Sequence, residues 1–263
     1  MSEPESAIVG VDFTPTTLRL ILSELDGEIL RQEEHPLPEL DDEAAWAWEV
    51  GGRISTLFAS EGGKRYALAI GVACPGTVDP VSGRIEECLA NDEWEGLNVV
   101  ASLRQHIDAP VVALARVEAA LRGEAALGNA AGTFDAMYVS LVDGPAAAIL
   151  TSGRILGGAH HRAGGLPAFP ELESDRPLIG EDLEQATALL ADLACLVDPS
   201  VVIIHGLPEH ADALRPVLQR VLNEVLPGAQ VAPGALGDRA ALIGALKAAA
   251  IVAYEGERAD DES

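Results

Sequence analysis

The sequence predicts an α/β protein built from two lobes. Two observations carry this prediction. Pairs of strand-like apolar segments alternate with helical segments twice along the 263 residues, an order typical of duplicated α/β folds. Apolar residues make up 48% of the chain, and a chain of this length can bury a large core. Because ligands usually bind where lobes meet, we expect the two lobes to enclose a cleft.

The first lobe is predicted over residues 7–113. Residues 7–30 are typical of a β-hairpin, with a Thr/Pro-rich first turn and a second strand closed by Asp26-Gly27. The predicted elements that follow are an acidic connection at 31–42, an amphipathic helix from about Asp42 to Glu61, a strand pair within 66–85 and a short helix within 94–107. Trp46 and Trp48 are interpreted as packing residues of the amphipathic helix.

The second lobe is predicted over residues 114–237. Its segments are a helix after the strand at 110–114, strands within 134–156, a Gly/His/Pro-rich loop at 157–180, a long helix to 199, a strand at 200–206 and a helix at 214–226. The closing Ala-rich helix, 238–254, is expected to pack back on the first lobe, and the acidic tail 255–263 is expected to be disordered.

The charge of the chain excludes several classes of partner. It has 17 Lys and Arg against 42 Asp and Glu, a net charge of −25. Binding to nucleic acid depends on clustered cations, so direct nucleic-acid binding is not expected. There is no uncharged apolar run of 18 residues and no basic leader, which predicts no membrane association and a cytoplasmic location. So acidic a surface suits high ionic strength.

Cysteine and histidine patterns give no sign of a metal. Cys74, Cys88 and Cys195 are widely spaced, so neither a disulfide framework nor a cysteine-rich zinc site is predicted. His160 and His161 are adjacent and have no partner ligands nearby in the sequence, which favours no metal site.

The order of several motifs resembles the ROK family of sugar kinases and sugar-responsive repressors. The motifs are the first hairpin, "IGVACPGTVDPVSGRI", "NDEWEGLNVVASL", "VDPSVVIIHG" and "ALGDRAALIGA". The resemblance runs from about residue 7 to 250, with a gap near 170. It implies the two-lobed, actin-like ATPase fold that is also ribonuclease H-like and hexokinase-like. About sixty residues that family members carry in the second lobe are missing, so a shortened C-terminal lobe is expected.

Arg116 stands where the family's kinases keep their catalytic base. The family segment reads E-N-D-A-N-A-A-A-L-G-E, and here residues 114–124 read "LARVEAALRGE". Gly123-Glu124 set the register, which aligns Arg116 with the aspartate and Ala115 with a sugar-binding asparagine. A guanidinium stays protonated and only donates, so it cannot act as a base. No catalytic residue is therefore assigned, and Arg116 is expected to pair with Glu118 or Asp143.

Both loops that would hold phosphates depart from the family's glycine-rich pattern. Backbone N–H groups reach an anion most easily from glycine. The first loop reads "DFTPTT" and the second "LVDGPAAAI", and each contains a proline without an N–H. The positions that the resemblance leaves for a nucleotide are Asp12, Thr16, Gly144 and Gly206. Asp12 would approach a metal-bound phosphate, or could equally be a hairpin cap.

The motifs that bind a sugar and zinc in the family are also incomplete in this sequence. The family's A-G-E-I-G-H motif and zinc-binding cysteines are replaced here by "AGGLPA" at 163–168 with no cysteine nearby. The resemblance leaves Asn91 and Gly76 as weak candidates for contact with a sugar.

These departures favour a ROK-like pseudokinase, a non-catalytic protein that binds a sugar, a sugar phosphate or a partner. It would form a homodimer and need neither nucleotide nor zinc. A divergent sugar kinase that uses ATP and Mg²⁺, with Glu118 as its base, is the alternative. A sugar-responsive transcription regulator without its own DNA-binding domain is a second alternative.

Overall fold

The computed structural model describes residues 5–40, 42–60, 65–142, 144–172 and 176–261. The chain divides into two units. Unit 1 comprises residues 1–122 and 241–263, and unit 2 comprises residues 123–240. The division falls within a helix, α3 (Arg116–Leu127), whose first half belongs to unit 1.

Unit 1 contains a five-stranded mixed sheet with the order β3-β2-β1-β4-β7. Its strands are β1 (Glu5–Phe13), β2 (Thr17–Ser23), β3 (Ile29–Pro36), β4 (Arg65–Cys74) and β7 (Val111–Ala115). β1 pairs with β2 in antiparallel fashion, and β2 with β3, whereas β1, β4 and β7 are parallel. A small sheet of β5 (Thr77–Asp79) and β6 (Arg84–Glu87) follows β4, and η1 (Asp92–Trp94) follows β6.

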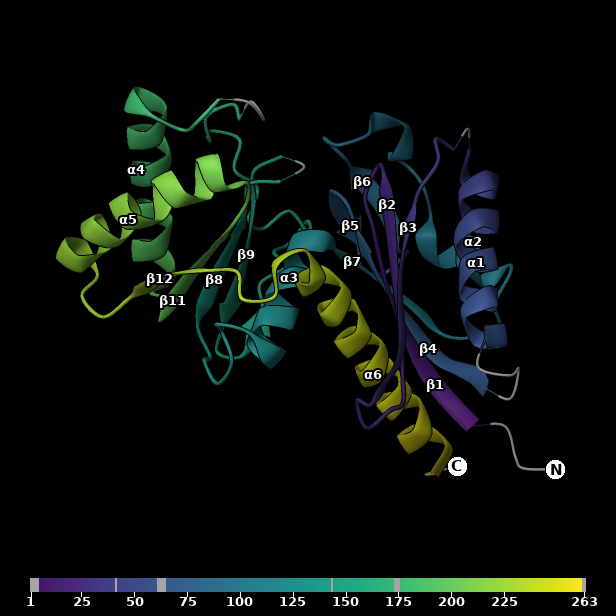
Figure 1. The fold of residues 1–263 in the computed structure, drawn as a ribbon. Helices are drawn as coiled ribbons and strands as arrows, with labels where there is room; N and C mark the ends of the chain where they lie inside the picture. Colours follow the sequence, from purple (N-terminus) through teal and green to yellow (C-terminus); the bar gives the residue numbers. More distant parts are fainter. Residues whose placement is uncertain (1–4, 41, 61–64, 143, 173–175, 262–263) are drawn as a thin grey trace. The chain divides into compact units, whose positions relative to one another are not determined.

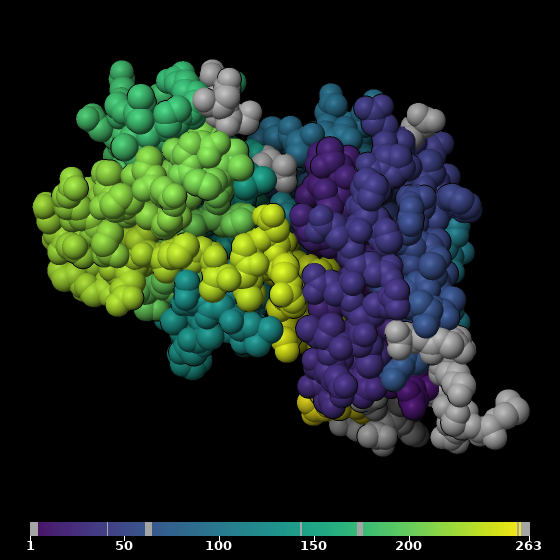
Figure 2. Space-filling model, viewed as in Figure 1, coloured from purple at the N-terminus to yellow at the C-terminus, as the bar shows by residue number. Residues whose placement is uncertain are grey.

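Helices cover both faces of this sheet (Figure 1). One face packs on α1 (Glu43–Ser60) and α2 (Val99–Arg104), and its core residues alternate along β1 and β2 as the hairpin pattern predicts. The other face packs on α6 (Ala240–Asp261) at very short range, because a Cβ on Gly71 would lie 1.9 Å from the carbonyl oxygen of Ala245. The N-terminal strands and α1, in purple and blue, form one continuous face of unit 1 (Figure 2).

Three features of unit 1 differ from the sequence-based expectations. Residues 31–42 were expected to be a connection, but β3 occupies 29–36. β3 is an edge strand that pairs only with β2, so most of its side chains are exposed and polar. Its sequence therefore lacks the apolar alternation by which a strand is predicted. Trp46 is buried, as expected for a packing residue, but Trp48 is 71% exposed. Helix α6 also continues to Asp261, through most of the segment expected to be a disordered tail.

Unit 2 has a second five-stranded mixed sheet, ordered β10-β9-β8-β11-β12. Its strands are β8 (Ala136–Ser140), β9 (Ala146–Thr151), β10 (Arg154–Ile155), β11 (Val201–His205) and β12 (Gln230–Pro233). The central β8 is parallel to β11 and antiparallel to β9. Helices α4 (Gly180–Val197) and α5 (Pro208–Val225) pack on this sheet through an apolar core, and η2 (Gly237–Arg239) precedes α6. β12 lies in a segment that was expected to be a loop.

Candidate functional site

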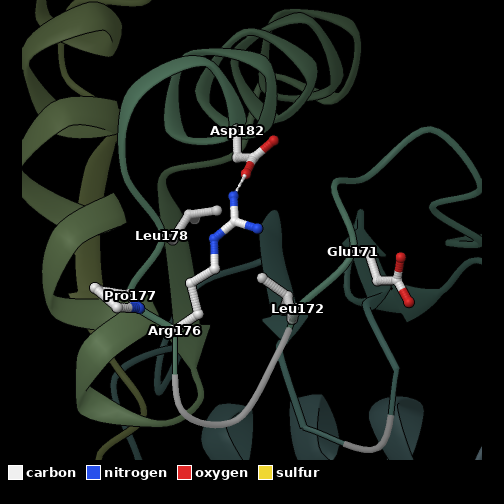
Figure 3. A pocket seen from close by; sticks show the side chains of 6 residues that line it. All are labelled: Glu171, Leu172, Arg176, Pro177, Leu178 and Asp182. Carbon is white, nitrogen blue, oxygen red and sulfur yellow. Dashed lines mark hydrogen bonds and ion pairs between the residues drawn. The ribbon is translucent and has the colours of Figure 1, made fainter.

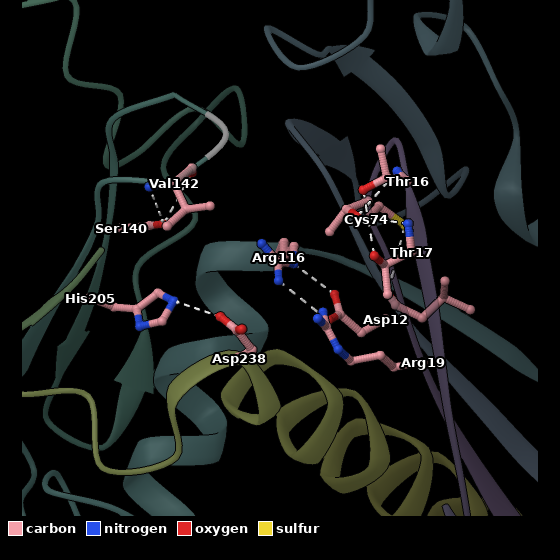
Figure 4. A network of polar contacts seen from close by, with 12 residues as sticks. Asp12, Thr16, Thr17, Arg19, Cys74, Arg116, Ser140, Val142, His205 and Asp238 are labelled. Atoms are coloured by element: carbon pink, nitrogen blue, oxygen red, sulfur yellow. Dashed lines mark hydrogen bonds and ion pairs between the residues drawn. The ribbon is translucent and has the colours of Figure 1, made fainter. Parts of the chain in front are cut away.

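Arg116 and Asp12 form an ion pair inside unit 1. Asp12 lies near the end of β1 and is fully buried, and Arg116 begins α3 directly after β7. Arg116 Nε donates to Asp12 Oδ1 at 2.8 Å, and Arg116 Nη2 lies 3.4 Å from Oδ2 (Figure 4). This partner was not expected: the sequence suggested Glu118 or Asp143, and Asp143 lies outside the described residues.

A second guanidinium reaches the same carboxylate. Arg19 is opposite Asp12 in the β1–β2 register, and its Nη1 lies 3.3 Å from Asp12 Oδ2. Arg19 Nε also donates to Glu34 of β3 at 2.9 Å. Both oxygens of Asp12 therefore accept from arginine. Asp12 is not a hairpin cap, because its carboxylate contacts side chains on β2 and α3 instead of the turn.

The turn of the first hairpin uses its own donors internally. The side-chain oxygen of Thr14 accepts from the N–H of Thr17 at 3.1 Å and of Thr16 at 3.4 Å, and the N–H of Thr14 donates to Thr17 O at 2.9 Å. Pro15 has no N–H. The Thr14 hydroxyl thus accepts from the N–H groups that a phosphate would need. The sequence did not indicate this role for Thr14.

Cys74 is the last residue of β4 and lies near Asp12 (Figure 4). Burial raises the pKa of its thiol well above the usual range, and the negative charge of Asp12 raises it further. The thiol is therefore protonated and unreactive under ordinary conditions.

Two other predicted positions of unit 1 serve the backbone. The side chain of Asn91 caps η1 by accepting from the N–H of Glu93 at 3.1 Å. Gly76 has a φ of +80°, and a Cβ there would lie 1.9 Å from Glu87 O, so only glycine fits. Contact of either residue with a sugar stays a prediction.

In unit 2, the second loop follows β8. Ser140 Oγ lies 3.3 Å from both the N–H and the carbonyl oxygen of Val142, which turns the chain at the end of the strand. Gly144 has a φ of +97°, a conformation that favours glycine whether or not a ligand is present.

A histidine at the end of β11 contacts an acidic side chain (Figure 4). His205 Nε2 lies 3.3 Å from Asp238 Oδ1, and the imidazole stacks on Tyr138 with the ring centroids 6.2 Å apart. The next residue, Gly206, packs against Leu141, because a Cβ on it would lie 2.7 Å from the Cβ of Leu141. Nucleotide contact at Gly144 or Gly206 stays a prediction.

Glu124, which served only to set the register, is a fully buried carboxylate in unit 2. Its Oε2 accepts from the N–H of Asn129 at 2.8 Å and its Oε1 from the N–H of Leu236 at 2.9 Å. Glu124 therefore joins the end of α3 to the loop before η2. An isolated Gly-Glu pair in a sequence gives no signal for such a role.

The described part of unit 2 also has a shallow pocket of about 180 Å³ near the start of α4 (Figure 3). Its lining residues are Glu171, Leu172, Arg176, Pro177, Leu178 and Asp182. Arg176 Nη2 is paired with Asp182 Oδ2 at 2.6 Å within the pocket. This volume includes space that is open to solvent, so the enclosed part is far smaller than an ordinary small-molecule site.

Neither a metal-binding cluster nor a membrane-spanning helix occurs among the residues that the structure describes. No group of three or more His, Cys, Asp and Glu side chains could hold a metal ion, and no helix is both long and apolar enough to cross a membrane.

The model of the ROK family matches residues 8–166, more than half of the chain. The chain belongs to the ROK family. Among solved structures, a ROK hexokinase from Thermus thermophilus matches with a TM-score of 0.74 at 21% identity, and the match covers 95% of this chain and all 100% of the hexokinase. These values confirm the predicted fold. No curated protein matches the sequence of this chain.

Both activities of the ROK family occur among similar structures. A ROK family glucokinase from Streptomyces griseus, in complex with glucose and AMPPNP, has a TM-score of 0.72 at 20% identity, and the match covers 92% of this chain and 99% of the glucokinase. A ROK transcriptional regulator, described as a homologue of the E. coli MLC protein, has a TM-score of 0.73 at 16% identity, with 95% and 79% covered. At these identities the likeness concerns the fold.

Proposed function

We propose that this member of the ROK family is a pseudokinase, a non-catalytic protein that binds a sugar, a sugar phosphate or a partner protein and acts in regulation. One observation carries the proposal: the residue at the position of the catalytic base, Arg116, is a cation that is ion-paired with the buried Asp12. Phosphoryl transfer to a sugar needs a group that accepts the proton of the attacking hydroxyl. A guanidinium cannot accept it.

The surroundings of Asp12 also fit poorly with Mg²⁺. A carboxylate binds Mg²⁺ through oxygens that face the ion or its water shell. Both oxygens of Asp12 already accept from Arg19 or Arg116, and each guanidinium would repel a divalent cation. A complex of Mg²⁺ and nucleotide is therefore not part of the proposed function.

The first phosphate loop supports the same proposal. A phosphate cradle presents N–H groups that lack protein partners. In residues 14–17 those N–H groups bond to Thr14 Oγ1 or to Thr17 O, and Pro15 has none. Binding of a phosphate here would first have to break these bonds.

A structural neighbour of this chain binds a sugar. The Streptomyces griseus glucokinase was solved with glucose, and its fold is shared with this chain. We propose that the present chain retains a sugar or sugar-phosphate site and acts as a homodimer, without ATP, Mg²⁺ or zinc.

The direct test is phosphoryl transfer by the purified chain. Glucose, mannose and N-acetylated amino sugars are offered with ATP and Mg²⁺ or with polyphosphate, and sugar phosphate is measured. The expected rate is the background rate without protein. A rate far above background, lost in Glu118→Gln and kept in a variant of an exposed arginine, Arg154→Asp, would instead establish a divergent kinase.

Thermal shift then identifies the ligand class. A ligand that binds only the native state stabilises it by about 2.7 kcal/mol at a hundredfold excess over its Kd. We expect a shift with a sugar or a sugar phosphate and none with ATP or ADP, with or without Mg²⁺. A nucleotide shift would contradict the pseudokinase as proposed. A sequence-specific gel shift of duplex DNA at low salt would favour a regulator that binds DNA directly.

A further inference from the structure

One edge of the unit 2 sheet is formed by an uncharged strand. β12 is the last strand of the order β10-β9-β8-β11-β12, so within the sheet it pairs only with β11. Residues 225–237, which include β12, carry no charge, although the chain has 17 Lys and Arg and 42 Asp and Glu. Edge strands without protection pair with strands of other molecules. The edge of β12 therefore has to be protected by something other than charge.

The edge strand β3 of unit 1 has the protection that β12 lacks. Its charged residues include Arg31, Glu33 and Glu34, and it ends at Pro36. Charged side chains and proline are the common means by which sheets keep an edge from pairing. β12 has only Pro233, at its last position. The two edges therefore need different explanations.

Alternate residues of β12 direct their backbone groups away from the sheet. The N–H of Gln230 donates inward to Ser200 O, just before β11, at 3.0 Å. Because backbone groups alternate in direction along a strand of a parallel pair, those of residues 229, 231 and 233 face outward. These are the groups that an added strand would bond.

An amide side chain of α5 occupies the place of such a strand. Gln219 Nε2 donates to Ala229 O at 3.1 Å, and Gln219 Oε1 accepts from the N–H of Val231 at 2.6 Å. One residue of a parallel strand would make the same two bonds, since its N–H and C=O bond to two residues that lie two positions apart. The side chain of Gln219 thus substitutes for one residue of a sixth strand.

The amide of Gln219 is held in this orientation by its own helix. Its Nε2 also donates to Asn223 Oδ1, one helical turn later, at 2.9 Å. With oxygen and nitrogen exchanged, the Gln219 amide would set an N–H against the N–H of Val231, and two donors cannot bond. The donor and the acceptor therefore each face the matching group of the strand edge.

A second amide covers the far end of β12. Asn129 Nδ2 donates to Pro233 O at 2.8 Å. The backbone N–H of Asn129 is itself bonded to the buried Glu124, which holds this residue in place. Outward-facing groups at both ends and in the middle of the edge are therefore bonded within the chain.

We propose that Gln219 and Asn129 close the outer edge of β12 against strand addition by a second copy of this chain. Without them, unpaired backbone groups would line an uncharged strand, the arrangement from which edge-to-edge pairing starts. Two copies with a charge of −25 repel one another, but the repulsion is least where both surfaces are uncharged. The proposal is independent of the pseudokinase and of its homodimer, because it concerns a contact that the native chain avoids.

Hydrogen exchange of the full chain tests whether the edge is closed. The N–H of Val231 should exchange slowly in the unmodified chain. Gln219→Ala removes its acceptor and should speed the exchange by roughly tenfold, the factor for one hydrogen bond of ordinary net strength. Gln185→Ala on α4 is the matched control, because that amide donates to Ala168 O in a turn. Fast exchange in the unmodified chain, or no difference between the two variants, would overturn the proposal.

Sedimentation velocity tests whether the opened edge pairs. Gln219→Ala combined with Asn129→Ala is compared with the unmodified chain in roughly 1 M NaCl, which shortens the Debye length to about 3 Å. The double variant should form a species of twice the mass that the unmodified chain forms, because two edges pair about a twofold axis. Gln185→Ala should not. Gln219→Ala alone, in which Ala favours the helix, gives a second test should the double variant not fold.

A charge on the opened edge separates strand pairing from a loss of stability. Gln230→Glu, added to the double variant, sets like charges opposite one another across the paired edges. It restores no hydrogen bond, so the Tm should stay that of the double variant while the doubled species disappears. A doubled species that persists with Gln230→Glu would overturn the proposal. A double variant that keeps the mass of the unmodified chain would overturn it as well.

Discussion

Two fully buried carboxylates, Asp12 in unit 1 and Glu124 in unit 2, are held in different ways. Glu124 accepts from two backbone N–H groups, whereas Asp12 accepts from two arginine side chains. Backbone donors are present whatever the sequence, but side-chain donors change with a single substitution. Glu124 is therefore part of the fold in the way that a helix cap is, whereas the surroundings of Asp12 depend on the identity of residues 19 and 116.

The largest effect is expected at Glu124. Glu124→Ala leaves the N–H groups of Asn129 and Leu236 buried without their acceptor and opens a cavity, so the free energy of unfolding should fall by roughly 3 to 5 kcal/mol. Urea unfolding measures it. Glu184→Ala on the exposed face of α4 is the control and should change it by less than about 0.5 kcal/mol. If Glu124→Ala lowers the free energy of unfolding no more than the control does, the contacts of Glu124 are not important for stability.

Asp12→Asn should have the next largest effect. It leaves Arg116 and Arg19 close together without the carboxylate between them, although Arg19 keeps Glu34. We expect a loss of about 2 to 3 kcal/mol in the free energy of unfolding. In a double-mutant cycle with Arg116→Met, the coupling between the two positions should be about 1 to 3 kcal/mol. Additive losses would mean that the ion pair contributes nothing of its own.

Thiol chemistry reports on the surroundings of Asp12 with a smaller signal. Cys74 and Cys88 are buried and Cys195 is exposed. Ellman's reagent should therefore modify one thiol per chain in the native state and three after unfolding. Asp12→Asn should leave the native count at one, because burial contributes more than the charge of Asp12 to raising the pKa of Cys74. Two rapidly reacting thiols in the variant would show that the charge protects Cys74.

The smallest effect concerns Glu33, a partly buried carboxylate on the edge strand β3. Hydrogen bonds from Arg31 and His35 lower the pKa of Glu33. A lowered pKa in the folded state adds stability above the ordinary value of 4.5, and the contribution is lost as the pH falls through the lowered pKa. Glu33→Gln should therefore cost less than about 0.5 kcal/mol at pH 7 and nothing near pH 2. A cost that grows on acidification would reverse the assigned direction.

The sequence predicted the order of elements from its apolar periodicity, and it predicted the family from five motifs that follow one another in the family's order. The alignment of Arg116 with the family's aspartate stays a prediction. Gly123, which set that alignment, is fixed by packing, because a Cβ on Gly123 would lie 2.2 Å from Ala240 O. β3 escaped prediction because an edge strand needs no apolar alternation.

The contacts of the site could not be predicted. Asp12 and Arg116 are 104 residues apart in sequence, and only the parallel pairing of β1, β4 and β7 brings them together. Arg116 had nearer acids in the sequence, which is why Glu118 and Asp143 were suggested. The capping role of Thr14 and the burial of Glu124 depend on backbone geometry that residue types do not encode.

The pairing of Asp12 with Arg116 also limits how this chain could change over evolutionary time. A single substitution to aspartate at residue 116 would set two acids side by side in a buried place, with Arg19 alone to neutralise them. That substitution should lower stability, and the loop at 14–17 would still bond its own N–H groups. Replacement of Arg116 by an acid would therefore need several changes together, whereas each change that preserves the ion pair can be accepted one at a time.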